Sequence, residues 1–249
     1  MINKFMRDPQ TNTLAVIVLA ILIAAWITSV VLTLRDTPIR TSKSWYAKLL
    51  LVSPLLAVPA MYDILQTNGI AFIFAVIAFF ALGLNIVIPI MQATRKTSHF
   101  LVRDWFKWSI PVLVIGGLAV AGYFTFIEST RTQVMCGPST PKCADVQNSK
   151  YAILFGIIPM GMFGLAGYIA IIAGWLLWQY GPNSLKKTGA LSIWGFCMFG
   201  VIFSIYLTFL EPFVIGATCM WCITSAVFMS MLLLASTPAT QQALAINDE

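Results

Sequence analysis

Long stretches without a charged side chain constrain the fold of this sequence more than any other feature. Residues 14–34 form an apolar run of 21 residues, and a helix of that length rises about 30 Å, the thickness of one bilayer core. The run is longer than the apolar core of a typical signal peptide, and no small-residue cleavage site follows it. Only 10% of all residues are charged, against about 25% in soluble domains. We therefore expect an all-α integral membrane protein.

Six further apolar runs predict additional membrane-spanning helices. Most of them have the length of one bilayer core and carry no charge in their middle. One run is ambiguous, because Pro54, Pro59 and Asp63 interrupt it and allow either a kinked span or a surface segment. The predicted spans are residues 49–65 (the ambiguous run), 70–91, 108–127, 151–180, 188–210 and 213–236.

The last four spans are expected to form one unit. A Gly116-Gly117 step in the first of them permits two helices to pack closely. We therefore expect a four-helix bundle at residues 108–236. A segment of about three transmembrane helices at 1–107 precedes it, and a polar, frayed tail at 237–249 follows it.

Lysine and arginine residues indicate which loops face the cytoplasm. If residues 49–65 span, the chain crosses the membrane seven times with its N-terminus outside, and ten basic residues lie on inner loops against five outside. If they do not span, there are six crossings, the N-terminus is inside and the split is eight to seven. The seven-span scheme fits better. Both schemes place residues 128–150 and the start of the last span on the outer, oxidising side.

Four of the five cysteines form two pairs on that outer side. Cys219-Met-Trp-Cys222 lies near the start of the last apolar run, and two thiols at this spacing on a helix can close a disulfide. A helix N-terminus also favours the reactive thiolate. Cys136 and Cys143 lie in the polar loop at 128–150. We expect the two pairs to exchange electrons; a buried structural pair and a plain loop staple are the alternatives.

The sequence does not favour other kinds of catalytic, metal-binding or nucleic-acid-binding site. The sequence has one histidine and no carboxylate pair at a spacing typical of glycosidases or proteases. The net charge of +6 comes with no clustered basic face for nucleic acid. A zinc site of four cysteines is not favoured on the oxidising side of a membrane, and Cys197, alone in mid-span, is expected to be a packing residue. The depth of the C-x-x-C pair suits a lipid-soluble two-electron acceptor such as a quinone, in a pocket lined by Trp221, Tyr206 and Phe213.

Motifs around both cysteine pairs resemble one known family. Quoted from this sequence, they are Cys136-x6-Cys143, Cys143-Ala-Asp-Val-Gln-Asn-Ser149-Lys-Tyr-Ala, Phe155-Gly156-Ile-Ile-Pro159, Gly164-x3-Tyr168, and Tyr206-Leu-Thr-Phe-Leu-Glu211 followed by Cys219-Met-Trp-Cys222. Together they resemble the vitamin K epoxide reductase family. The resemblance covers about residues 108–236 and leaves the first hundred residues unmatched.

The resemblance implies a four-helix bundle around a quinone, either menaquinone or ubiquinone. Cys219 and Cys222 are similar to the family's active-site pair, in which Cys222 would be the thiolate that contacts the quinone and Cys219 the sulfur that the loop attacks. Cys143 is the implied attacker, and Cys136 would exchange with a separate thioredoxin-like (DsbA-like) protein outside the cytoplasm. Ser149 matches a polar residue that the family places by the active site. The implied catalytic residues are Cys219, Cys222, Cys136 and Cys143, and the expected quinone-binding residues are Cys222, Ser149, Tyr206 and Trp221.

Two departures favour a bacterial-type member of that family. Ala226 stands where vertebrate members carry a quinone-binding tyrosine, and Met160 stands where they carry an asparagine. This pattern indicates a quinone-dependent thiol–disulfide oxidoreductase that supports disulfide formation, rather than an epoxide reductase. The chain carries no fused thioredoxin-like domain, which implies a separate partner.

One alternative from a different class is a non-enzymatic membrane subunit that its disulfides only brace. A transporter subunit is not favoured, because the spans hold almost no ionisable residue in their middle. Two carboxylates, Glu128 and Glu211, stand at the outer ends of predicted spans and are expected to be solvated.

Overall fold

The computed structural model describes residues 2–7, 9–34, 108–130, 146–147, 149, 151–154 and 158–245. The predicted spans at 49–65 and 70–91 lie outside these residues. The described elements are α1 (Ile2–Phe5), α2 (Pro9–Leu34), α6 (Ser109–Thr130), β1 (Ile153–Leu154), β2 (Ile158–Pro159), α8 (Met160–Tyr180), α9 (Asn183–Leu210), the π-helix η1 (Glu211–Ile215) and α10 (Met220–Ala245).

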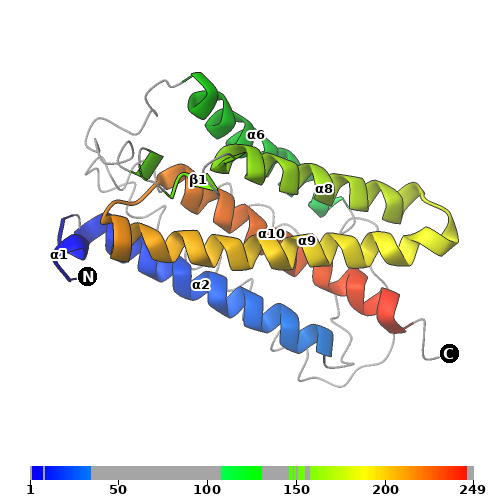
Figure 1. The fold of residues 1–249 in the computed structure, drawn as a ribbon. Coiled ribbons are helices and arrows are strands. Elements are labelled where there is room, and N and C mark those ends of the chain that lie inside the picture. Colours follow the sequence, from blue (N-terminus) through cyan, green and yellow to red (C-terminus); the bar gives the residue numbers. More distant parts are fainter. Residues whose placement is uncertain are drawn as a thin grey trace, which may run out of the picture.

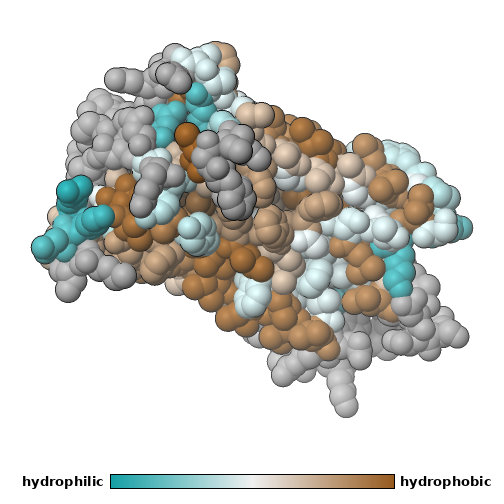
Figure 2. Space-filling model, viewed as in Figure 1, coloured by the Kyte–Doolittle hydropathy of each residue, from teal (hydrophilic) through white to brown (hydrophobic). Residues whose placement is uncertain are grey.

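Five of the described helices are long and apolar enough to cross a membrane, as expected for an all-α membrane protein. Their apolar spans are Thr11–Leu34, Ser109–Thr130, Met160–Tyr180, Asn183–Ile215 and Trp221–Leu244. Hydrophobic side chains cover the middle of the visible face, and hydrophilic ones gather toward its ends (Figure 2). The only strands in the described part are β1 and β2, which pair antiparallel over two residues each.

Helix α10 forms the centre of the bundle. Some 89% of its apolar span is buried, and it packs against α9, α2 and α6, while α8 lies against α6 and α9 (Figure 1). The sequence of α10 is apolar on all sides, which is the pattern of a helix buried within a protein. This composition allows it to have neighbours on most sides. The expected four-helix arrangement of α6, α8, α9 and α10 is therefore present, with α2 added against α9 and α10.

Helix α2 runs parallel to α10 and starts beside the C-x-x-C pair. The Thr218 hydroxyl donates to Asn12 Oδ1 at 3.0 Å near the start of both helices, and the Ser29 and Thr237 hydroxyls share a hydrogen bond of 2.7 Å farther along. The N-terminal end of α2 therefore lies beside the N-terminal end of α10, at the same end of the bundle as Cys219. The seven-span scheme requires this arrangement, and the six-span scheme would place the two at opposite ends.

Two helix boundaries differ from the sequence-based ones at the site end of the bundle. The span predicted to start at 151 begins as α8 at Met160, after Pro159, because proline is tolerated at a helix start but not in its interior. The span predicted to start at 213 is preceded by η1 and by an extended segment, with Gly216 at φ 79° closing the π-helix. The last helix therefore starts only at Met220.

The polar tail beyond residue 236 was expected to fray, but α10 continues to Ala245. Thr237 and Thr240 are buried, and Gln241 Nε2 donates to the Leu32 carbonyl at 2.6 Å. These polar side chains have partners on neighbouring helices, and buried hydrogen bonds stabilise helix association in a membrane. Contacts with α2 and α9 thus extend the helix beyond what composition predicts.

The Gly116-Gly117 step allows the close packing expected from the sequence. A Cβ atom on Gly117 would overlap the ring of Tyr168, and one on Gly116 would lie 2.6 Å from the ring of Phe228. Tyr168 is fully buried and its hydroxyl is hydrogen-bonded to Ser225, so its ring has little room to move. The two glycines therefore let α8 and α10 approach α6.

We predict that Gly117→Ala destabilises the protein by about 1–3 kcal/mol, because overpacking a well-packed interior carries a penalty of that size. Gly122→Ala on the same helix is the matched control, since a Cβ there meets nothing within 4 Å. Thermal unfolding of the two purified variants in detergent measures the difference. Equal melting temperatures for the two variants would show that the glycine is not needed for packing.

Candidate functional site

A short segment between α9 and α10 positions the C-x-x-C pair. Pro212 has no N–H to continue an α-helix, and the chain widens into the π-helix η1. The Glu211 carbonyl accepts the N–H groups of Gly216 at 2.8 Å and Ala217 at 3.3 Å. Its side-chain atom Oε2 accepts the N–H of Cys219 at 3.2 Å. One residue thus holds three backbone groups of the segment that leads to the cysteines.

Cys219 directly precedes α10, and Cys222 lies in the first turn of that helix. The Cys219 carbonyl accepts the first hydrogen bond of the helix, from Ile223 N at 3.1 Å. Both cysteines are free thiols. Cys219 is buried and Cys222 is partly exposed. The pair therefore sits at the helix start itself rather than one turn into it.

The electrostatics of the pair favour a thiolate at Cys219. The hydrogen bond from the Cys222 thiol lowers the pKa of Cys219 below its ordinary value, although burial opposes this. The backbone N–H groups of Cys222 and Trp221 lower that pKa further. The sequence-based expectation that a helix start favours the thiolate therefore applies to Cys219, the first cysteine of the pair.

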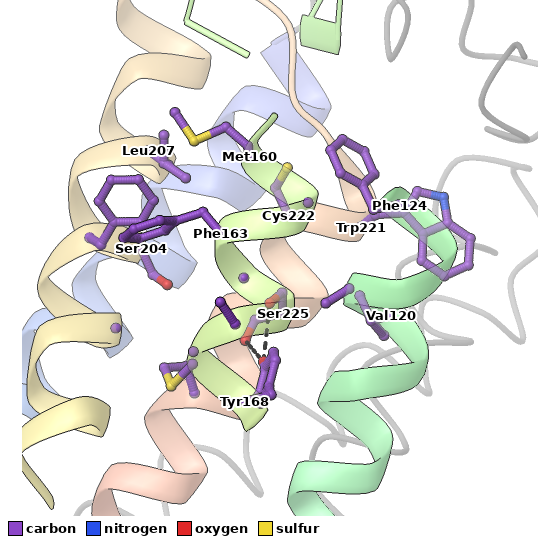
Figure 3. Close-up of a pocket in the computed structure, with 18 of the residues that line it drawn as sticks. Val120, Phe124, Met160, Phe163, Tyr168, Ser204, Leu207, Trp221, Cys222 and Ser225 are labelled. Carbon is purple, nitrogen blue, oxygen red and sulfur yellow. Dashed lines mark hydrogen bonds between the residues drawn. The ribbon is translucent and has the colours of Figure 1, made fainter. Parts of the chain in front are cut away.

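A cavity of about 520 Å³ lies between α6, α8, α9 and α10. Cys222 lines it near Met160 and Leu207, and the hydroxyl of Tyr168 bonds to Ser225 farther along the cavity (Figure 3). Tyr168 Oη lies 3.0 Å from the Ser225 carbonyl and 3.1 Å from its Oγ. Most of the lining is apolar or aromatic, and the volume is in the range of small-molecule sites. The cavity therefore suits a flat apolar molecule with few polar atoms.

Trp221 lies beside Cys222 on the wall of the large cavity. Its ring is 4.5 Å from that of Tyr123, centroid to centroid, which holds it in place. Its indole nitrogen is buried and has no hydrogen-bond partner in the described part of the chain. Buried tryptophan N–H groups usually have one.

A second, much smaller cavity adjoins Cys222. Its volume is about 30 Å³, and its lining includes Ser149, Tyr151, Glu211 and Cys222. That volume is large enough for a water molecule. Cys222 thus lines both cavities, whereas Glu211 lines only the small one.

Only some of the predicted site residues lie close to one another in the structure. Cys219, Cys222 and Trp221 pack together, and Ser149 lines the small cavity next to Cys222. Tyr206 does not line either cavity: it is 50% exposed on α9, beside Phe203. Ser204 and Thr208 of the same helix line the large cavity instead, because residues two apart on a helix point to different sides. Cys136 and Cys143 lie outside the described residues.

Sequence reasoning missed Glu211. It was expected to be solvated at the outer end of a span, but only 2% of it is exposed. The chain folds back over it through η1, and α1 covers this turn from outside, where Lys4 Nζ donates to the Val214 carbonyl at 2.5 Å. The available signal was an acidic residue eight positions before Cys219 in an otherwise apolar stretch. Glu128 is partly buried, and its Oε2 accepts the Gly161 N–H at 2.9 Å.

Comparisons with known proteins match the same part of the chain. The model of the Vitamin K epoxide reductase family matches residues 108–237. A curated protein, Thiol-disulfide oxidoreductase LTO1 of Arabidopsis thaliana, is 29% identical over 117 residues, which are 45% of this chain and 30% of that protein. The chain therefore matches less than a third of the length of this relative. No solved structure gives a significant match.

We predict that Cys222→Ala raises the pKa of Cys219, because it removes the donor that stabilises the thiolate. In a protein whose other three cysteines are changed to serine, the first thiolate should form below the ordinary value of about 8.5. The ultraviolet absorbance of the thiolate, followed against pH, measures this. Cys222→Ser keeps a hydroxyl donor and is the control. Identical titrations for the alanine and serine variants would contradict the assigned cause.

Proposed function

The chain belongs to the vitamin K epoxide reductase family, and we propose that it is a membrane thiol oxidase that passes electrons from protein thiols to a quinone. Its thiol substrate is a separate thioredoxin-like protein on the outer side of the membrane. The observation that carries the proposal is the position of Cys222, which lies beside a free Cys219 and lines an apolar cavity of about 520 Å³.

The two sulfur atoms of the C-x-x-C pair have different surroundings, which supports different roles. Cys222 lines the large cavity, so its sulfur is the one that faces the quinone. Cys219 is absent from that lining and is the sulfur that an incoming thiolate attacks. The attack joins Cys219 to the incoming cysteine in a mixed disulfide. The lowered pKa of Cys219 makes its sulfur a good leaving group when that mixed disulfide is broken. A quinone supplies the capacity to take up two electrons and two protons.

Cys136 and Cys143 are proposed to connect the partner with the C-x-x-C pair. A thiol pair of the partner reduces the Cys136–Cys143 disulfide and becomes oxidised itself. The reduced loop pair then reduces the Cys219–Cys222 disulfide, with Cys143 as the attacking sulfur. Each exchange breaks one S–S bond and forms another, so two electrons and two protons move from pair to pair. Both loop cysteines lie outside the described residues, so the support for this step comes from the sequence.

The lining of the large cavity supports a quinone rather than an epoxide substrate. Ala226 replaces the tyrosine of vertebrate members, is 1% exposed and does not line the cavity. Met160, in place of their asparagine, contributes an apolar wall. The hydroxyls of Tyr168 and Ser225 supply polar contacts, and Trp221 forms part of the wall. We retain residues 108–236 as the redox unit and 1–107 as a separate segment, whose helix α2 packs on it.

The alternative of a non-enzymatic subunit remains distinguishable. A pair of cysteines that only braces the fold needs no neighbouring cavity, whereas Cys222 lines two. The alternative requires all cysteines to stay oxidised in cells whatever the quinone supply. Trapping thiols with a maleimide after quinone depletion separates the two functions, since the proposed oxidase must then accumulate in its reduced form.

The direct test is quinol formation without oxygen. Membranes that contain the protein, a reduced thioredoxin-like protein and a quinone should yield quinol, and Cys219→Ala and Cys222→Ala should abolish it. Cys136→Ala should impair oxidation of the protein substrate more than oxidation of a small dithiol, which does not depend on docking at the loop pair. Absence of quinol from the wild type, with all four thiols reduced, would refute the proposed function.

We predict that Gly167→Leu raises the KM for quinone by at least tenfold. Gly167 lines the large cavity, and nothing lies within 4 Å of a Cβ built on it, so a leucine side chain fills space that the quinone needs. A steric loss of about 1.4 kcal/mol in binding corresponds to tenfold. Gly195→Leu is the control, since its Cβ also meets nothing and the residue is outside the lining. Equal KM values for the two variants, from initial rates of quinol formation, would place the quinone elsewhere.

A further inference from the structure

Glu211 contacts the sulfur of Cys222 as well as the backbone. Its carboxylate accepts a hydrogen bond from the Cys222 thiol and another from the Cys219 N–H. The Cys222 thiol is also hydrogen-bonded to the Cys219 sulfur. The proton of Cys222 therefore lies within reach of two acceptors, one on each side. A structural role for Glu211 would need only the backbone contacts.

We propose that Glu211 transfers the proton directly to and from the Cys222 sulfur during disulfide exchange, beside the small cavity that both residues line. This inference rests on the proposed function, because it names the acid and base of that reaction. The side chain is 2% exposed. Proteins adjust buried carboxyl groups so that they can act as acids near neutral pH, and such a group typically contributes 10²–10⁴-fold to a rate.

The exchange step balances as follows for the Cys219–Cys222 disulfide. An incoming thiolate attacks the Cys219 sulfur, forms a new S–S bond with it, and breaks the bond to Cys222. The electron pair of the broken bond leaves on the Cys222 sulfur, which takes the proton of Glu211. Glu211 becomes a carboxylate and takes the proton back when Cys222 is oxidised again. Over the whole cycle Glu211 is unchanged. The two electrons of the thiol substrate end on the quinone, the two protons that its thiols lose pass to water, and the quinone takes up two protons in their place.

Glu211 and Cys222 also line the small cavity, together with Ser149 and Tyr151. Glu211 is absent from the lining of the large cavity, so its carboxyl group lies outside the space proposed for the quinone. The Ser149 hydroxyl donates to the Val146 carbonyl at 2.7 Å and keeps its oxygen lone pairs as acceptors. Most of the other residues that line the small cavity are apolar, so the proton passes directly between Glu211 and Cys222. Ser149 lines this small cavity and not the large one.

Glu211→Gln isolates proton transfer from hydrogen bonding. The glutamine carbonyl can still accept from the Cys219 N–H and the Cys222 thiol, but the amide cannot give up or take a proton at neutral pH. The parent protein carries Cys136→Ser and Cys143→Ser, which leaves the C-x-x-C disulfide as the one that reacts. Its reduction by dithiothreitol, without quinone, is stopped by acid at set times, and the free thiols are alkylated and counted by mass.

We predict that Glu211→Gln slows this reduction about 100-fold or more. The pH profile also changes: the parent slows at high pH as Glu211 loses its proton, and the glutamine variant loses that limb. In the part of the chain that the structure describes, the other titratable groups near the cysteines are Glu128 on α6, Lys4 on α1, Tyr151 beside the small cavity and the two thiols themselves. They are the same in both proteins, so their contributions cancel in the comparison.

Two further variants separate proton transfer from a general loss of charge or fold. Glu128→Gln removes the other carboxylate that acts on both cysteines and should leave the rate unchanged, because Glu128 contacts the Gly161 N–H and not a sulfur. Glu211→Asp keeps an acid on a shorter side chain and should restore part of the rate together with the high-pH limb. A glutamine variant with the rate and pH profile of the parent would overturn the inference. A parent whose disulfide does not react at all would overturn the proposed function itself.

Discussion

The hydrogen bonds of Glu211 determine where the redox pair lies. A buried carboxylate and the backbone groups around it must find partners, because an unsatisfied polar group inside a protein is strongly unfavourable. Here the carbonyl of Glu211 binds Gly216 and Ala217, and its side chain binds the N–H of Cys219. These bonds fold the chain back after α9 and set the residue at which α10 begins. The positions of both thiols follow from that start.

Cys222 lines two cavities of very different size. The large one lies between four helices that are long and apolar enough to cross a membrane, and the small one also has Glu211 in its lining. In the proposed function the large cavity takes the lipid-soluble acceptor, and Cys222 is the sulfur that faces it. Cys219 is buried and does not line that cavity.

Helix α2 contributes to this arrangement although it lies outside the matched family region. Asn12 accepts a hydrogen bond from Thr218, next to Cys219, and its own amide donates to the Phe5 carbonyl at 2.8 Å. A Cβ on Gly216 would lie 2.7 Å from the Lys4 carbonyl oxygen, so α1 reaches the closing residue of η1 as well. The N-terminal helices therefore brace the segment before the cysteines, and they contribute no residue to the lining of the large cavity.

Sequence alone determined the membrane class, the number and approximate position of the last four helices and the glycine step at Gly116-Gly117, and it singled out Cys219 and Cys222 as candidate site residues. These follow from long apolar runs and short motifs, which are local. Tertiary structure decided where α10 begins, which residues of α9 face the cavity, and that Glu211 is buried beside a thiol. Those features depend on η1 folding back and on neighbouring helices covering it, and contacts between residues distant in sequence leave no periodic signal in composition. An acid at the end of a span looks the same in sequence whether water or a sulfur atom lies next to it.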